Sequence, residues 1–275
     1  MCLKSKNNNF SYPTLYQKSK ILQAVKLAPN IYRIRFENSI IAGCSEPGQF
    51  INIRISENYV PLWRRPFSIH RIHREQGWAE ILFQVVGKGT GLLAQKKIGD
   101  TLNFIGPLGQ GFKLPGEKIE TALIIAGGIG IAPLYLLCQK LTEKGITLCL
   151  YWGTKTKPEF CCLEDFQNLN ININLSTDDG SAGFHGFITD LVSSKIKEFT
   201  NTEIFACGPN PMLHRVNLIA RKNKLPCQVS LETLMACGLG ACLGCGVKAA
   251  NTNIKYRYVC KDGPVFNSSE IDLSD

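Results

Sequence analysis

Four cysteines near the end of the chain have the spacing of a metal-cluster site. Cys237, Cys242, Cys245 and Cys260 follow the pattern Cys-x4-Cys-x2-Cys-x14-Cys in the segment CGLGACLGCGVKAANTNIKYRYVC. A Cys-x4-Cys-x2-Cys run with a distant fourth cysteine is typical of plant-type [2Fe-2S] loops. A zinc site is the alternative, but it usually has two Cys-x2-Cys pairs, and this segment has one. The spacing therefore predicts a [2Fe-2S] cluster.

Glycines are interspersed among these cysteines, at positions 238, 240, 244 and 246. A loop that wraps around a cluster needs positive φ angles and close approach of its backbone, and glycine permits both. Backbone N–H groups can then point at the sulfurs, which is one way in which a protein sets the potential of its cluster. We expect such N–H groups in this loop.

A second group of residues is suited to a flavin dinucleotide. Arg65-Pro66-Phe67-Ser68 begins a predicted strand, and Gly87-Lys88-Gly89-Thr90-Gly91 follows about twenty residues later. An arginine offers a planar fork to a pyrophosphate, and the Ser68 hydroxyl can hydrogen-bond the edge of an isoalloxazine ring. We expect Thr90 to be the N-cap of a helix over GLLAQKK, with Gly89 exposing the amides of a phosphate site. The RPFS segment alone is more typical of an ordinary edge strand, and the glycine segment shifts the interpretation towards a flavin.

A third group is suited to a nicotinamide dinucleotide. The segment IIAGGIGIAP, residues 124–133, reads as a buried strand, a glycine turn and a helix that begins at proline. Gly128 and Gly130 would let a pyrophosphate approach backbone amides at the end of a parallel strand. The full G-x-G-x-x-G pattern is absent, so a simple strand-to-helix turn stays open as an alternative.

Cys207-Gly208-Pro209 follows the predicted strand EIFA in the second half of the same region. Glycine and proline leave room for a flat ring over the backbone, and we expect the small Cys207 side chain to face that ring, where a nicotinamide meets the flavin. Lys155 and Lys157 could contact a 2′-phosphate. Because no arginine accompanies them, the sequence favours NAD over NADP.

Two other groups receive no ligand role. His70 and His73 alternate with isoleucines along the RPFS strand, and we interpret them as ordinary strand residues. Cys161 and Cys162 are adjacent and have no ligand spacing. No histidine is placed as a catalytic base, and no catalytic residue is predicted in this chain.

The elements that must hold these groups fall into three regions. Residues 21–112 contain six short segments of alternating apolar and polar residues, which predict a small antiparallel β-barrel. From residue 121 the order strand, helix, strand predicts a doubly wound parallel α/β sheet. We therefore expect an α+β multidomain protein with a flavin barrel over 18–115, a nucleotide domain over 116–231 and a small [2Fe-2S] domain over 232–275.

Composition limits the classes of function. The formal charge of +9 over 275 residues comes from scattered basic residues, which argues against nucleic acid as a partner. No stretch reaches the about 18 apolar residues of a membrane span, and the first twenty residues lack the apolar block of a signal peptide. We expect a cytoplasmic protein without membrane contact, in which the twelve cysteines serve metal ligation, redox chemistry or burial rather than disulfides.

The order of these parts resembles the ferredoxin-NADP reductase superfamily: RPFS and GKGTG, then GGIGIAP and CGP, then the cluster loop. Within it, the chain is similar from about residue 18 onward to electron transfer subunits of dihydroorotate dehydrogenase B. The ending carries the most specific resemblance, LETLMACGLGACLGCGVKAA followed by YVCKDGPVFNSSEI. Departures are an Asn- and Lys-rich extension through about residue 20, the Cys161-Cys162 pair and the tail DLSD.

The resemblance implies three cofactors and a partner. FAD would be bound by Arg65, Pro66, Phe67, Ser68, Leu82, Phe83, Gln84, Gly89 and Thr90, and the cluster by the four cysteines. NAD would be the electron acceptor. The implied partner is a catalytic subunit that contains FMN and oxidises dihydroorotate in pyrimidine (UMP) synthesis, in a heterotetramer of two plus two.

Two alternatives stay open. One is a related NAD(P)H-flavin reductase subunit of the same architecture that serves a hydrogenase or another flavoprotein. The other is a redox-sensing or purely interacting protein that has kept the fold without turnover. Intact ligands and phosphate loops argue against the second alternative.

Overall fold

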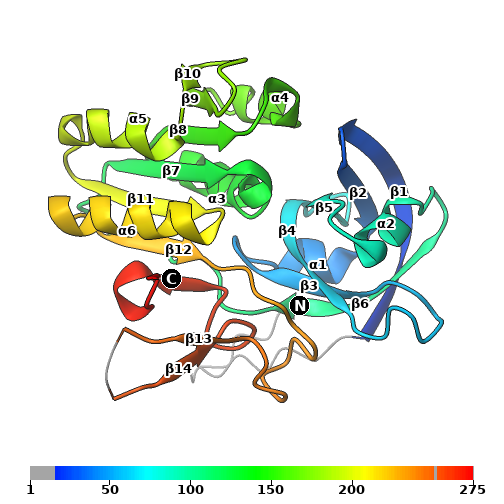
Figure 1. Cartoon of the computed structure of the whole chain (residues 1–275). Coiled ribbons are helices and arrows are strands. Elements are labelled where there is room, and N and C mark those ends of the chain that lie inside the picture. The colour runs from blue at the N-terminus through cyan, green and yellow to red at the C-terminus, as the bar shows by residue number, and fades with distance from the viewer. Residues whose placement is uncertain (1–15, 251–252, 275) are drawn as a thin grey trace.

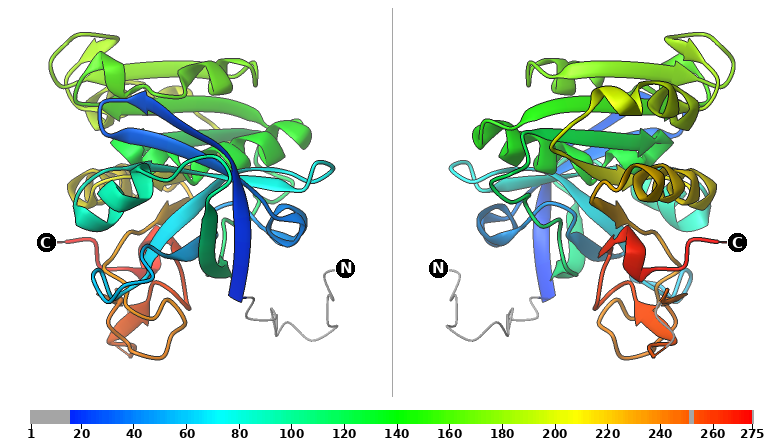
Figure 2. Two further views of the ribbon diagram at one scale, coloured as in Figure 1. Left: turned by 90° about the vertical axis from the view of Figure 1, so that its right-hand side faces the viewer. Right: turned by 90° about the vertical axis from the view of Figure 1, so that its left-hand side faces the viewer.

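The computed structural model describes residues 16–250 and 253–274 and has three parts. A β-barrel and an α/β sheet lie side by side, and the cysteine-rich segment lies beneath both of them (Figures 1 and 2). Most of the Asn- and Lys-rich extension, residues 1–15, lies outside the described residues.

The first part is a closed barrel of six strands in the order β1-β2-β5-β4-β3-β6. Its strands are β1 (Tyr16–Ala28), β2 (Ile31–Glu37), β3 (Phe50–Arg54), β4 (Arg65–His73), β5 (Trp78–Gln84) and β6 (Thr101–Leu108), with α1 (Ser39–Cys44) and α2 (Lys88–Ala94) between them. Alternate side chains point inward and form one apolar core, for example Ile34, Phe36, Ile51, Ile53, Ile69, Ile81 and Phe104. Every neighbouring pair in the barrel is antiparallel, so the predicted antiparallel barrel is confirmed.

The second part is a seven-stranded sheet in the order β10-β9-β8-β7-β11-β12-β15. Its strands are β7 (Thr121–Gly127), β8 (Thr147–Thr154), β9 (Asn172–Thr177), β10 (Phe184–His185), β11 (Thr202–Cys207), β12 (Cys227–Ser230) and β15 (Val265–Asn267). All neighbours from β10 to β12 are parallel, and only β15 runs antiparallel to its neighbour. The strand order reverses between β7 and β11. Gly128 and Gly130 lie in the turn that directly follows β7.

Helices cover both faces of this sheet, as the doubly wound prediction requires. Helices α3 (Leu134–Glu143) and α4 (Leu163–Gln167) pack on one face together with Trp152. Helices α5 (Ile188–Lys195) and α6 (Asn210–Asn223) pack on the other face (Figure 1). Short 3₁₀ turns, including Gly128–Ile131, lie between these elements.

The cysteine-rich segment is less separate than its composition indicates. Strands β13 (Gly246–Lys248) and β14 (Tyr256–Tyr258) form a small sheet of their own, but β15 pairs with β12 and extends the nucleotide sheet. Composition could not show this pairing, because a three-residue strand has no measurable periodicity. The pairing fixes the cysteine loop against the sheet.

No helix within residues 16–250 or 253–274 is both long and apolar enough to cross a membrane.

Candidate functional site

The four predicted cysteines come together in one loop region. The Sγ atoms of Cys245 and Cys260 are 3.2 Å apart, and both residues are buried. Cys237 is partly exposed and Cys242 is exposed. The cluster site therefore has a buried side and a side that faces solvent.

Backbone N–H groups point at these sulfurs, as expected. The amides of Leu239 and Cys242 approach Cys237 Sγ at 3.3 and 3.4 Å, and the Gly240 amide approaches Cys260 Sγ at 3.1 Å. Burial opposes ionisation of Cys237, yet these amides lower the pKa of its thiol to about 6. Such N–H groups stabilise negative sulfur, which is what a cluster ligand needs.

On the buried side of the site, formed by Cys245 and Cys260, ionisation of the thiols is unfavourable when no metal is bound. Burial, and then the neighbouring Cys245, raise the pKa of the Cys260 thiol to about 12. Two sulfurs in contact can both ionise when a cation lies between them. The donor set of four sulfurs, two of them crowded and buried, fits a [2Fe-2S] cluster.

The path of the loop depends on left-handed backbone at three positions. Gly238, Gly240 and Leu243 have φ angles of +70°, +78° and +60°. Gly244 and Gly246 have no positive φ angle, so only two of the four predicted glycines serve the turn in this way. A Cβ at Gly238 would lie 2.5 Å from the Asn52 amide nitrogen on β3. That amide donates to the Cys237 carbonyl at 3.2 Å and ties the loop to the barrel.

A cavity of about 210 Å³ lies between the barrel, the nucleotide sheet and the segment that precedes the cysteine loop. Most of the predicted flavin residues line it: Pro66, Phe67, Ser68, Leu82, Phe83, Gln84 and Thr90. Arg65 and Gly89 lie beside it in contact with each other, since a Cβ at Gly89 would be 3.5 Å from Arg65 Nε. Among the described residues no carboxylate forms an ion pair with Arg65, so its guanidinium is suited to a phosphate.

The helix beside this cavity differs from the prediction. Helix α2 begins at Lys88 with Gly87 as its N-cap, so Thr90 is the third helical residue. The Thr90 hydroxyl accepts hydrogen bonds from the amides of Val86 and Gly87 at 2.9 and 3.2 Å. The expectation of Thr90 as N-cap was wrong. Thr90 lies within the first turn of the helix, and its hydroxyl binds the amides of the residues that precede the helix.

Two residues of this cavity were missed by sequence reasoning. Thr233 has a buried hydroxyl oxygen that finds no hydrogen-bond partner within the described chain, and Glu232 precedes it. An orphaned hydroxyl in a cavity wall fits a polar ligand such as a flavin ring edge. The sequence offered one hint of their role. In the segment LETL, residues 231–234, a carboxyl and a hydroxyl group stand between the last parallel strand and the cysteine loop.

Replacing Arg65 by lysine tests the pyrophosphate contact. The lysine keeps the charge but loses the two parallel N–H donors of the guanidinium. We expect FAD to dissociate about 10-fold more readily, since hydrogen bonds to charged groups contribute about 1.5–3 kcal/mol. The measurement is a titration of the flavin-free chain with FAD, and Arg74→Lys, in the turn at the opposite end of β4, is the control. Equal affinity of the Arg65 variant and the wild type would contradict the role.

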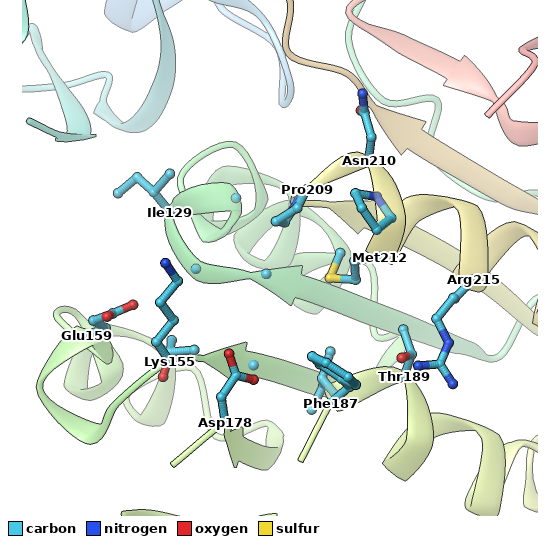
Figure 3. A pocket seen from close by; sticks show the side chains of 18 of the residues that line it. Ile129, Lys155, Glu159, Asp178, Phe187, Thr189, Pro209, Asn210, Met212 and Arg215 are labelled. Carbon is cyan, nitrogen blue, oxygen red and sulfur yellow. The ribbon is translucent and has the colours of Figure 1, made fainter. Parts of the chain in front are cut away.

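A larger cavity of about 770 Å³ lies at the carboxyl ends of β7 and β11 (Figure 3). Gly128, Gly130, Gly208 and Pro209 line it, so the two predicted loops do come together. A ligand in an open α/β sheet binds where the strand order reverses, and β7 and β11 are the strands on either side of that point. The residues present fit a dinucleotide.

The two loops approach closely because they contain glycine. A Cβ at Gly130 would lie 2.4 Å from the Cys207 carbonyl oxygen, and one at Gly208 would lie 3.0 Å from Gly127 Cα. Gly128 has a φ of +53° and open space where its Cβ would be. Gly130 therefore holds the loops together, and Gly128 leaves backbone accessible to a ligand.

Cys207 does not face the cavity as expected. Its side chain is fully buried in the core on the α3 side of the sheet, and burial raises the pKa of its thiol. The last residue of a parallel strand points to one face of the sheet, and here that face is covered. Only the Cys207 backbone contributes, through its contact with Gly130.

Charged side chains that follow β8 and β9 line one wall of this cavity. Lys155, Glu159 and Asp178 are on one side, and Pro209 and Met212 are opposite (Figure 3). Lys157 does not line the cavity.

Gln84, Ile129 and Glu232 line both cavities, which therefore meet at these three residues. The Glu232 side chain is exposed to these cavities, and the partial loss of solvent around its carboxyl raises the pKa of that group. On the cluster side, Met235 lines the smaller cavity two residues before Cys237. The three sites are thus neighbours around one segment, residues 230–237.

Comparison with known proteins agrees with this geometry. The model of the iron-sulfur cluster binding domain of dihydroorotate dehydrogenase B matches residues 232–272, and that of the oxidoreductase NAD-binding domain matches residues 124–217. A solved chain described as an NADH-dependent reduced ferredoxin-NADP oxidoreductase superposes with a TM-score of 0.83 at 31% identity, over 93% of this chain and 90% of its own.

Curated relatives span nearly the whole chain. The dihydroorotate dehydrogenase B (NAD(+)) electron transfer subunit of Desulforamulus reducens is 40% identical over 92% of this chain and 97% of its own length. The subunit of the same name from Geobacillus kaustophilus is 38% identical over 90% of this chain and 95% of its own length. By this full-length similarity and by its cluster loop, the chain belongs to the family of dihydroorotate dehydrogenase B electron transfer subunits.

Proposed function

We propose that this chain transfers electrons between NAD and a partner flavoprotein subunit that contains FMN and oxidises dihydroorotate. Nicotinamide exchanges two electrons as hydride, an iron–sulfur cluster exchanges one, and a flavin does both. A chain that holds FAD beside a cluster therefore converts two-electron into one-electron transfer. In the cell this would connect dihydroorotate oxidation in pyrimidine synthesis with the NAD pool.

Each cofactor has a proposed set of residues. Those for FAD are Arg65, Pro66, Phe67, Ser68, Leu82, Phe83, Gln84, Gly89 and Thr90, to which we add Thr233. For NAD they are Gly128, Gly130, Gly208, Pro209 and the backbone of Cys207, and for the cluster they are Cys237, Cys242, Cys245 and Cys260.

The observation that carries this proposal is the shared wall between the sites. Glu232 lines both cavities, Thr233 lines the smaller one, and Cys237 follows four residues later. Phe50 of β3 lines the flavin cavity and packs in the same core cluster as Cys245 and Cys260. A flavin ring at this wall would have the nicotinamide on one side and the cluster on the other.

We propose NAD rather than NADP because of Asp178. This carboxylate follows β9 and lines the large cavity. An acidic residue in such a position hydrogen-bonds ribose hydroxyls and repels a 2′-phosphate. Lys155 is the one lysine of the predicted pair on the same wall.

Replacing Asp178 by asparagine tests this preference. We expect the ratio of kcat/KM for NADH to that for NADPH to fall about 10-fold, which corresponds to about 1.4 kcal/mol, because one repulsive charge is removed. Steady-state diaphorase kinetics with both nucleotides measure the ratio. Asp179→Asn, at the neighbouring residue that does not line the cavity, is the control. An unchanged ratio in the Asp178 variant would exclude the role.

The partner is proposed to dock at the exposed side of the cluster. Cys242 is exposed there, and Leu234, Leu239 and Leu243 are 93%, 46% and 53% exposed. Apolar side chains around an exposed cluster ligand suit a protein interface, because they exclude water when a partner covers them. We propose a heterotetramer of two chains of each kind.

A second candidate function is electron transfer to a ferredoxin or another flavoprotein. It is favoured by the likeness to the ferredoxin-NADP oxidoreductase chain, which extends over nine-tenths of both chains. Reduction by NADH of a ferredoxin at a rate above that with the FMN subunit would favour this second function.

The purified chain alone provides the first test. It should contain FAD, iron and acid-labile sulfide, and it should reduce an artificial acceptor with NADH. It should leave dihydroorotate unchanged, since that oxidation belongs to the partner. Turnover of dihydroorotate by the chain alone would contradict the proposal.

A further inference from the structure

A group of ligand-type side chains that line neither cavity lies where the barrel meets α4. His70 is on β4, while Cys162 and Asp165 are at the beginning and inside α4. One potential ligand atom from each of these residues lies within 4.8 Å of the other two. The sequence showed no such group, because residue 70 is some ninety positions before residue 162.

His70 contributes an unused nitrogen. Its ring is fully buried, and Nδ1 lies 2.9 Å from the carbonyl oxygen of Ala132, directly after the glycine turn. The other ring nitrogen, Nε2, is buried and has no hydrogen-bond partner among the described residues. Since the Ala132 carbonyl can only accept, the proton is on Nδ1 and Nε2 presents a lone pair. A buried lone pair without a donor is costly, and a cation satisfies it.

Asp165 is held in a fixed orientation. Its two carboxylate oxygens accept from Arg33 and Arg71, each at 2.8 Å. Each oxygen has a second lone pair that these contacts leave available. The fully buried Glu80 lies near the same arginines and offsets their charge. Arg35 also pairs with Glu80, at 2.7 Å, so three arginines face two carboxylates. Thiolates formed on binding would have to supply the negative charge that a cation needs here.

Cys161 provides a second sulfur and a route from solvent. Cys162 is buried at 5% exposure, whereas Cys161 is partly exposed and its thiol interacts with that of Cys162. The Cys161 sulfur is not among the ligand atoms that lie within 4.8 Å of one another, so it would turn toward them to complete the site.

We propose that His70, Cys161, Cys162 and Asp165 form a site for one thiophilic divalent cation of the Zn²⁺ class. The ligands would be His70 Nε2, two thiolates and one Asp165 oxygen, a donor set that Zn²⁺ accepts in tetrahedral geometry. Binding releases the two thiol protons to solvent, and His70 stays neutral with Nδ1 bound to Ala132. The ligands come from β4, from α4 and from the two residues before α4, so the cation joins the barrel to the nucleotide domain.

The test uses the chain loaded with FAD and its cluster, so that the four cluster cysteines are occupied. It is titrated with Cd²⁺, whose bonds to thiolates give an ultraviolet charge-transfer band, and its melting temperature is measured with and without Zn²⁺. We expect one equivalent of Cd²⁺ to produce the band. Zn²⁺ should raise the melting temperature, because a ligand that binds only the folded state stabilises it.

Variants locate the cation. His70→Asn keeps a donor for the Ala132 carbonyl but lacks Nε2, and Cys161→Ser changes a partly exposed position. We expect each to weaken Cd²⁺ binding at least about 10-fold. Cys149→Ser, on the opposite face of the sheet, is the control and should bind like the wild type. Retained flavin and cluster absorbance shows that a variant has folded. No band in the wild type, or unchanged binding by both site variants, would overturn the proposal.

Discussion

Replacing Cys242 by serine is expected to stop electron transfer through the cluster while leaving hydride transfer from NADH to FAD intact. The variant should lack the cluster, because a serine hydroxyl is a poor substitute for thiolate. Hydride transfer from NADH to FAD should continue, since neither cavity is lined by Cys242. Transfer between FAD and the FMN subunit should fall at least about 100-fold, which corresponds to about 2.7 kcal/mol in the barrier.

The measurement compares two acceptors at the same NADH concentration. Reduction of a two-electron dye measures electron transfer from NADH to FAD alone. Reduction of the FMN subunit measures transfer from NADH through FAD and the cluster. Loss of the cluster also removes the bonds that join its four ligands, so retained FAD absorbance is used to show that the variant has folded. Ala241→Ser adds the same hydroxyl one position earlier and should keep both activities. Equal loss of both activities in the Cys242 variant would show that the cluster does not lie beyond the flavin.

Replacing Gly130 by alanine is expected to have the second large effect. The new Cβ would lie 2.4 Å from the carbonyl oxygen of Cys207, which is backbone and cannot move aside alone. The β7 and β11 loops must therefore separate, and such overpacking costs about 1–3 kcal/mol. Because both loops line the large cavity, kcat/KM for NADH should fall at least about 10-fold.

Gly43→Ala is the matched control. A Cβ there has no atom within 4 Å, and the residue lies inside α1, far along the chain from either loop. Stopped-flow reduction of the bound FAD by NADH measures the effect directly. The cluster content of the Gly130 variant should stay normal, since this loop does not contact the cluster cysteines. FAD content is measured for each variant and used to normalise the rates, because Ile129 of the same loop lines the flavin cavity. NADH reactivity equal to that of the control would contradict the role of this glycine.

The cluster was the most predictable part of the site. Its four ligands lie within 24 residues, and the spacing of Cys237, Cys242, Cys245 and Cys260 is set by the chemistry of the ligated ion. The barrel and the parallel sheet were predictable for a similar reason. Their strands repeat every two residues or alternate with helices, so the signal is local.

Other features depended on packing between distant segments. The sequence did not indicate Glu232 and Thr233 as site residues. They line the cavities because the chain after β12 passes between them. Cys207 was expected to face a ring, but the side of the sheet on which it lies is set by the pleat and by α3. Leu243 takes a positive φ that its residue type does not indicate. The pairing of β15 with β12 likewise has no local signal.

The central claim concerns how NAD, FAD, the cluster and a partner are connected. It is tested most directly by co-purifying the chain with a candidate FMN subunit and measuring NAD⁺ reduction driven by dihydroorotate. We predict that the complex forms NADH, that the FMN subunit alone does not, and that the Cys242→Ser complex loses the reaction while keeping NADH–dye activity. NADH formation at the wild-type rate by the Cys242→Ser complex would contradict the account.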